Sequence, residues 1–177
     1  MRLTVRTDYA LRVLIYLSLE RGGTATIDVI ANAYGISHSH LKKVVNELAQ
    51  HGVLETVRGR AGGVRLTKDP GSISIGEIVR LVEKDFAVVE CHDDAAESDC
   101  VIIQVCNLRR VLRRAVDAFM YELDKATLAD AAAAPSVLAD IFGTDPLGAV
   151  NSRGAPLRQR SSAAVLMAPP RSRSRQP

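Results

Sequence analysis

Residues 26–67 read TIDVIANAYGISHSHLKKVVNELAQHGVLETVRGRAGGVRLT, and their helix boundaries can be inferred from the capping residues. Thr26 can cap a short helix that ends at Gly35, and Ser37 can cap a second helix that ends at Gly52. Apolar residues recur at helical spacing in the second helix, at Leu41, Val44, Val45 and Leu48. The short connection between the two helices is typical of a helix-turn-helix.

A β-hairpin is predicted directly after these helices. Residues 53–58 end in a β-forming run, residues 64–67 can form a second short strand, and the segment GRAGG at 59–63 supplies the turn. Two strands around a glycine-rich, basic tip make a wing. The predicted fold class is therefore mainly α with a small β-hairpin wing, a winged helix-turn-helix.

Two further helices complete this first domain. Residues 7–20 carry apolar positions at helical spacing, Thr7 can cap them, and Gly22-Gly23 breaks the pattern. Ser74 can cap another helix with its apolar face inward. We assign residues 1–84 to the winged-helix domain.

The rest of the chain divides into three segments. Residues 85–106 are predicted to be a loop that carries the cysteines. Residues 101–145 are predicted to form a dimerisation helix from about Val101 and a short C-terminal helix at 128–134, which Thr127 caps and Pro135 stops. Residues 146–177, which hold five of the seven prolines, are predicted to be a disordered basic tail. The predicted apolar stripe of the dimerisation helix comprises Leu108, Leu112, Ala115, Val116, Phe119 and Leu123.

The distribution of charge is more informative than the total. The 177 residues are 47% apolar with a net charge of +3, but residues 1–68 carry +5, residues 69–150 carry −8 and residues 151–177 carry +6. A basic N-terminal part followed by an acidic part suggests a nucleic-acid surface joined to a different module.

Without a long apolar run or a leader segment, we expect a cytoplasmic protein. No nucleophile–base pair or phosphate-binding glycine loop stands out, so we do not expect an enzyme.

The second helix of the helix-turn-helix carries short polar and cationic side chains where a recognition helix enters the major groove of double-stranded DNA. The wing adds arginines that could contact phosphates or the minor groove. Alternatively Ser37 only caps its helix and the arginines are solvated. A single winged helix contacts few phosphates, so a homodimer on a palindromic promoter site is expected. The candidate DNA-binding residues are Ser37, His38, Ser39, His40, Lys42, Lys43, Arg58, Arg60 and Arg65.

The three cysteines, Cys91, Cys100 and Cys106, lie within 16 residues. An odd number of clustered thiols favours metal binding or redox chemistry over disulfides. The chain lacks the Cys-x-x-Cys pair of most structural zinc sites, whereas three thiolates with a fourth ligand can hold an iron–sulfur cluster. The alternative is three unmodified cysteines on a loop. His92 is interpreted as a solvated loop residue and not as a ligand.

Several motifs together closely resemble the Rrf2 family of winged-helix regulators over residues 1–134. They are MRLT at 1–4, TDYALR at 7–12, AYGIS at 33–37 and VRGRAGGVRL at 57–66. The resemblance implies a homodimer with one cluster per subunit, 4Fe–4S or alternatively 2Fe–2S, held by Cys91, Cys100 and Cys106. It also implies that Asp8, in the first helix of the other subunit, completes the site.

Within this family, the segments around the cysteines and TLAD at 127–130 are most similar to the branch that senses nitric oxide. The resemblance thus implies a repressor with nitric oxide as its signal. An iron-responsive regulator of the same family and a zinc-stabilised, non-sensing DNA-binding protein are the alternatives. Another branch places a His ligand three residues after the last cysteine, where this chain has Arg109. The arginine-rich tail departs from the family pattern.

Overall fold

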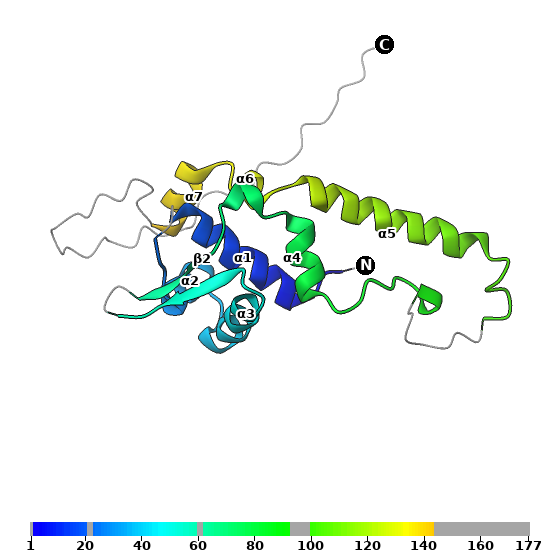
Figure 1. Cartoon of the computed structure of the whole chain (residues 1–177), viewed down its shortest axis with the longest axis horizontal. Coiled ribbons are helices and arrows are strands. Elements are labelled where there is room, and N and C mark those ends of the chain that lie inside the picture. Colours follow the sequence, from blue (N-terminus) through cyan, green and yellow to red (C-terminus); the bar gives the residue numbers. More distant parts are fainter. Residues whose placement is uncertain (1, 21–22, 60–61, 93–99, 144–177) are drawn as a thin grey trace, which may run out of the picture. The chain divides into compact units, whose positions relative to one another are not determined.

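The computed structural model describes residues 2–20, 23–59, 62–92 and 100–143, so the predicted tail at 146–177 lies outside the described residues (Figure 1). The elements in chain order are α1 (Val5–Leu19), α2 (Ile27–Tyr34), α3 (His38–Gln50), β1 (Leu54–Val57), β2 (Gly63–Leu66), the 3-10 turn η1 (Pro70–Ser72), α4 (Ile75–Val82), the 3-10 turn η2 (Glu90–His92), α5 (Asn107–Lys125), α6 (Leu128–Ala131) and α7 (Pro135–Phe142).

The capping residues set the helix boundaries, with one correction. Thr26, Ser37, Ser74 and Thr127 each accept a hydrogen bond from a backbone N–H in the first turn of their helix, as predicted. Helix α1 begins two residues earlier than expected, because the side chain of Thr4 accepts from the Thr7 backbone N–H at 3.3 Å. The prediction that Thr7 is the cap was therefore wrong, and its side chain is fully buried.

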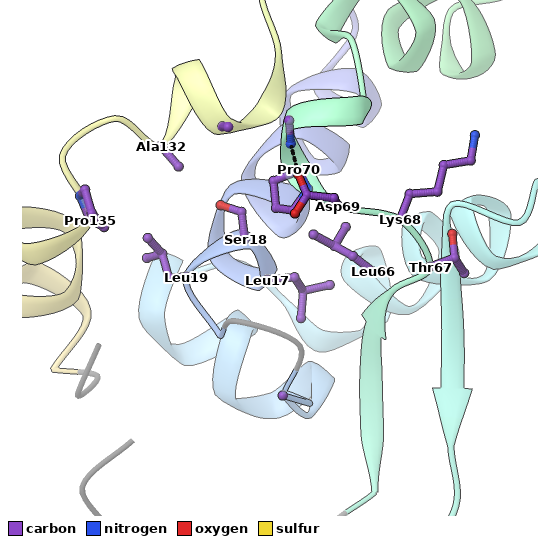
Figure 2. A pocket seen from close by; sticks show the side chains of 13 residues that line it. Leu17, Ser18, Leu19, Leu66, Thr67, Lys68, Asp69, Pro70, Ala132 and Pro135 are labelled. Carbon is purple, nitrogen blue, oxygen red and sulfur yellow. Dashed lines mark hydrogen bonds between the residues drawn. The ribbon is translucent and has the colours of Figure 1, made fainter. Parts of the chain in front are cut away.

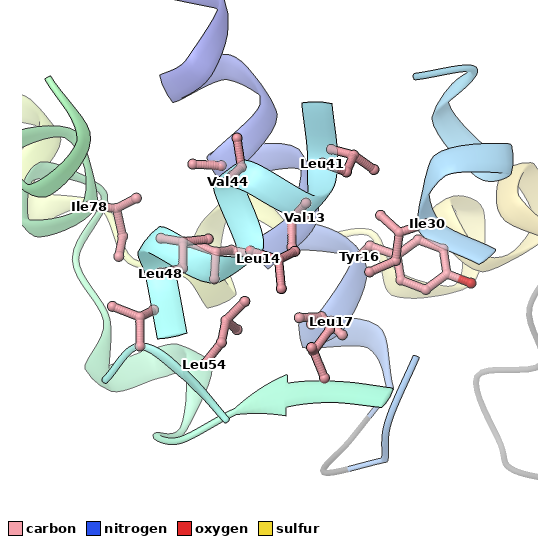
Figure 3. Packing of buried hydrophobic residues seen from close by; sticks show 14 of the residues in the cluster. Val13, Leu14, Tyr16, Leu17, Ile30, Leu41, Val44, Leu48, Leu54 and Ile78 are labelled. Carbon is pink, nitrogen blue, oxygen red and sulfur yellow. The ribbon is translucent and has the colours of Figure 1, made fainter. Parts of the chain in front are cut away.

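The hydrophobic core surrounds α1 and joins it to α3, α4 and the wing. Leu14 of α1, Leu48 of α3 and Ile78 of α4 are each fully buried. Figure 3 shows Leu14, Leu48 and Leu54 pointing toward one another from α1, α3 and β1. Burying apolar area of this kind contributes about 25 cal/mol per Å². The predicted recognition helix, α3, is therefore packed firmly against α1. A movement of α1 would be passed on to α3.

The wing is a two-stranded antiparallel hairpin that is anchored to the segment before α2. Leu54 pairs with Leu66 and Val57 pairs with Gly63. An isolated bridge adds Ala25, whose backbone N–H donates to the Val64 carbonyl at 3.1 Å and whose carbonyl accepts from Val64 at 2.9 Å. A Cβ atom on Gly63 would lie 2.6 Å from the Ala25 carbonyl oxygen, so glycine allows this close approach.

Helix α5 begins at Asn107 and not near Val101. Residues 100–105 instead make successive tight turns, in which Ile103 donates to the Cys100 carbonyl and Val105 donates to the Ile102 carbonyl, each at 3.0 Å. The β-branched residues in this segment have low helix propensity, and this is the physical reason for the later start.

The predicted apolar stripe of α5 is only partly covered in the described chain. Leu112, Val116, Phe119 and Leu123 are half-buried, whereas Leu108 and Ala115 are exposed. The single buried residue of α5 is Met120, which the stripe did not include. The described chain therefore leaves much of the N-terminal half of α5 open.

The C-terminal half of α5 packs on α4. The Arg80 guanidinium donates to both carboxylate oxygens of Asp124, at 2.5 and 2.7 Å. A Cβ atom on Gly76 would collide with Oδ1 of Asp124 and lie 3.0 Å from the Asp124 backbone nitrogen, so glycine allows the two helices to approach closely with this ion pair in place. Helix α6 ends at Ala131 and not at the predicted residue 134, so the prediction that Pro135 stops it was wrong. Pro135 instead begins α7, because proline is tolerated in a first turn where its missing N–H has no helical partner.

No helix among the described residues has both the length and the apolar character needed to span a lipid bilayer.

Candidate DNA interface and cysteine site

The first turns of α3 present the six polar residues that the sequence singled out. Ser37, His38, Ser39, His40, Lys42 and Lys43 are all exposed, while Leu41, Val44, Val45 and Leu48 of the same helix are buried. Ser37 caps the helix by accepting from the His40 backbone N–H, and its hydroxyl lies 3.2 Å from that of Ser39. Nε2 of His38 lies 3.5 Å from the Asp28 carboxylate. One face of α3 is thus polar and accessible, as major-groove contact requires.

The wing supplies two described arginines, and one of them is already paired. Arg58 and Arg65 are exposed. Nε of Arg65 donates to the Glu55 carboxylate across the hairpin at 2.5 Å. This pairing reduces the positive charge that Arg65 offers to a phosphate. Arg60, also predicted to contact DNA, lies outside the described residues.

Two contacts that the sequence did not suggest join the first two turns of α1 to α3. Nε of Arg6 lies 2.7 Å from Oε2 of Glu47. The ring of Tyr9 stacks on that of His40, with centroids 6.3 Å apart and planes 29° apart. The two contacts hold α3 near both of its ends.

The cysteines lie on the segment that leads into α5. Cys91 is in η2 and half-buried, Cys100 is exposed, and Cys106 is half-buried at the N-cap position of α5. The Cys106 side chain makes no capping hydrogen bond. Residues 93–99, between the first two cysteines, lie outside the described residues.

Arg109 connects η2 to the first turn of α5. Its Nε donates to the Cys91 carbonyl at 3.0 Å, and its own carbonyl oxygen accepts from Nε2 of His92 at 3.0 Å. His92 is half-buried by this contact and is not the solvated residue that the sequence suggested.

Asp8, the fourth residue assigned to the site, lies in the first turn of α1. Its carboxylate accepts from Nε of Arg12 at 3.0 Å and lies 2.9 Å from the Nη2 atom of the same guanidinium. That guanidinium also lies 5.8 Å from the ring centroid of Tyr34. Burial raises the pKa of Tyr34 to about 12, although Arg12 acts in the opposite direction.

The described part of a single chain does not gather a complete metal site. Within residues 2–20, 23–59, 62–92 and 100–143, no group of three or more His, Cys, Asp or Glu side chains is arranged to hold a metal ion. The donor chemistry nevertheless fits an iron–sulfur cluster, since three sulfur donors suit soft iron.

One further hollow, of about 680 Å³, lies at the base of the wing (Figure 2). Its walls come from the end of α1, the segment 66–71, α6 and Pro135. The polar groups that line it bond within the chain. The Thr67 hydroxyl donates to the Gly52 carbonyl at 2.6 Å, and the Asp69 carboxylate accepts from the Gly71 backbone N–H at 2.8 Å.

The winged helix with an exposed polar face on α3 defines a transcriptional regulator that binds DNA, and not an enzyme. A family model described as "Rrf2: Iron-dependent Transcriptional regulator" matches residues 3–134, and the chain belongs to the Rrf2 family. This confirms the family that the sequence motifs indicated.

Similar proteins agree with this assignment. The chain is 53% identical over 131 residues to the HTH-type transcriptional regulator NsrR of Bacillus subtilis, covering 73% of this chain and 89% of the relative. Protein aau3 of Rhizobium meliloti is 37% identical over 164 residues, covering 93% of this chain and all of the relative.

Solved structures confirm the predicted fold class. The global cysteine regulator CymR of B. subtilis has a TM-score of 0.63 at 28% identity, covering 75% of this chain and 97% of that one. IscR of T. potens has a TM-score of 0.57 at 23% identity, covering 73% and 85%, which supports the fold alone.

Proposed function

We propose that this regulator is a homodimeric repressor that binds palindromic promoter DNA and senses nitric oxide through an iron–sulfur cluster. Cys91, Cys100 and Cys106 would hold the cluster, and Asp8 of the partner subunit would complete it. The observation that carries this proposal is the placement of three sulfur donors on the segment that ends at the N-cap of α5. The 53% identity to a regulator named NsrR supports the nitric-oxide branch.

The DNA contacts follow from the exposure of α3 and the wing. The first turns of α3 would enter the major groove, where Ser and His side chains can bond base edges and Lys42 and Lys43 neutralise phosphates. Arg58 and Arg60 of the wing would contact the flanking backbone. Arg65 must first exchange its Glu55 partner for a phosphate.

A dimer along α5 is supported by the apolar side chains that the single chain leaves exposed. Large hydrophobic residues are 49% to 98% exposed on α5 and the turns before it, namely Val101, Ile102, Val105, Leu108, Val111 and Tyr121. A second copy would bury them. Two recognition helices about one DNA turn apart would then fit the half-sites of a palindrome.

The route from the cysteine segment to the DNA runs through the first turn of α1. The Thr4 backbone N–H donates to the Glu83 carboxylate at 2.6 Å, and Glu83 ends α4 just before the cysteine segment. Arg6 of this turn and Tyr9 of the next then connect α1 to Glu47 and His40 of α3. A shift of the first turn would therefore reach both ends of the recognition helix.

When bound, the cluster would supply a soft, thiolate-ligated iron centre that reacts with nitric oxide. The chain's own contribution is the coupling between that centre and α3. A change of about 1–3 kcal/mol in DNA-binding free energy is enough to switch promoter occupancy.

The iron-responsive alternative is favoured by one observation, the family description as iron-dependent regulators.

One experiment tests both the proposed function and this alternative. The protein is purified anaerobically, examined by visible spectroscopy, and then titrated with nitric oxide or an iron chelator while DNA binding is followed by fluorescence anisotropy. We expect a coloured protein whose DNA affinity falls with nitric oxide. Loss of affinity with the chelator alone would favour the iron sensor, and a colourless zinc protein that binds DNA unchanged would contradict both.

A further inference from the structure

Arg109 and His92 form a reciprocal pair of hydrogen bonds across 17 residues of sequence. The Arg109 side chain donates to the backbone of Cys91, and the His92 side chain donates to the backbone of Arg109, both at 3.0 Å. Since a carbonyl oxygen only accepts, Nε2 of His92 carries the hydrogen in this contact. Each residue thus uses its side chain to hold the other segment's main chain.

The location of this pair is significant because it connects two cysteines. Arg109 lies three residues after Cys106, in the first turn of the helix that Cys106 begins. The two bonds therefore fix the backbone around Cys91 to the turn that follows Cys106.

The chemistry of the Arg109 side chain excludes one alternative role for that residue. A guanidinium has no lone pair for a metal, so Arg109 cannot be a ligand. Nε2 of His92 donates to the Arg109 carbonyl, and this bond orients the imidazole ring. Both residues are half-buried, so water competes less for these bonds than at a fully exposed site.

We propose that Arg109 and His92 are positioning residues that hold Cys91 against the first turn of α5 before any metal is bound. Their role at a cluster site rests on the proposed function, but the two hydrogen bonds themselves are present in the chain without a cluster. Holding two ligand-bearing segments together in advance lowers the ordering cost of binding. Cys100 lies outside the pair and must be brought to the site by another contact.

The test uses thiol alkylation of the full-length apoprotein, followed cysteine by cysteine with iodoacetamide and peptide mass spectrometry. Arg109→Met and His92→Leu each remove one donor. We expect alkylation of Cys91 to accelerate about fivefold, the change in an opening equilibrium that one hydrogen bond of ordinary net strength produces. The rates of Cys100 and Cys106 should stay within about twofold of wild type.

Matched variants separate positioning from general destabilisation. Arg114→Met removes the same charge from an exposed position on the same helix and should leave the Cys91 rate unchanged. His92→Gln retains an amide donor and should restore most of the protection. The double variant should equal either single one, since loss of one bond releases the same segment. Equal acceleration at all three cysteines, or none at Cys91, would overturn the proposal.

Reconstitution distinguishes this inference from the proposed function. Suppose that the wild-type apoprotein takes up no cluster from iron and sulfide, but Cys91 alkylation accelerates in the variants as expected. The positioning contact is then supported and the sensor function is contradicted. If wild type takes up a cluster but the Cys91 rate is the same in Arg109→Met, the sensor stands and the positioning role is wrong.

Discussion

Nε of Arg6 lies 2.7 Å from Oε2 of Glu47, so an ion pair joins the first turn of α1 to the C-terminal half of α3. The Glu47 side chain is only 18% exposed, whereas that of Arg6 is 42% exposed. Oε2 of Glu47 is buried without a hydrogen-bond partner among the described residues. The contact has the distance of an ion pair but not the alignment of a hydrogen bond.

Removing Arg6 should therefore be more costly than removing both partners. We expect Arg6→Met to lower the free energy of unfolding by about 1–2 kcal/mol, because the largely buried Glu47 carboxylate loses its cation. Glu47→Gln in the Arg6→Met background should recover part of this loss. Urea unfolding of the two single variants and the double variant would give the coupling energy, and strictly additive effects would contradict an interaction.

The Glu55–Arg65 pair leads to a prediction about DNA. Glu55→Gln should strengthen binding to any DNA duplex, because it releases Arg65 from a carboxylate 2.5 Å away and removes one negative charge from the wing. The dependence of log Kobs on log salt concentration should become steeper by about one unit. Fluorescence anisotropy at several salt concentrations would measure both.

The control for this change is Arg65→Met. In that background Glu55→Gln should alter affinity much less, because no guanidinium remains to be released. An equal gain with and without Arg65 would mean that only the general charge of the wing matters.

Much of the helical part of the fold was predictable because most of its helix boundaries have a local chemical signal, whereas the start of α5 at Cys106 has no side-chain cap and was missed. Ser37 and Ser74 cap their helices through their own side chains, and Gly35 adopts the left-handed conformation that ends α2. Such signals act over four or five residues and do not depend on tertiary structure. These signals failed where the same residue type can have two local roles. Pro135 is an example, because a proline can follow the end of one helix or begin the next.

The contacts around the candidate site could not be predicted, because they join residues far apart in the sequence. Arg6 and Glu47 are a charged pair among many on amphipathic helices, and nothing in the spacing connects them. From the sequence, Arg109 was noted only because it replaces a histidine. Its side chain bonds to the main chain at Cys91, and such a bond cannot be predicted from the residue type because every residue has a backbone carbonyl. The cysteines were found because three thiols within 16 residues are rare.

Tyr34 predicts how stability depends on alkaline pH. Burial raises its pKa to about 12 in the folded chain, above the value of about 10 in an unfolded chain. Between these values the unfolded chain loses a proton that the folded chain keeps, so the free energy of unfolding should fall as pH rises from about 10 to 12.

The Tyr34→Phe variant isolates this contribution. It should lose less stability than wild type over the same pH range, by up to about 2 kcal/mol, while differing little at pH 7. Urea unfolding at each pH would measure this difference. Parallel loss of stability in both proteins would assign the effect to other groups.

Asp8 gives the sharpest test of the fourth ligand. A carboxylate oxygen is a hard donor and iron in a cluster is soft, so Asp8→Cys should give a cluster that loses iron to a chelator more slowly and reacts more slowly with nitric oxide. Asp28→Cys is the matched control, because Asp28 also lies in the first turn of its helix and its ion-pair partner among the described residues is His38. Visible absorbance would follow both reactions. If Asp8→Cys and Asp28→Cys behave alike, Asp8 is not a ligand, and its bond to Arg12 serves only to stabilise the first turns of α1.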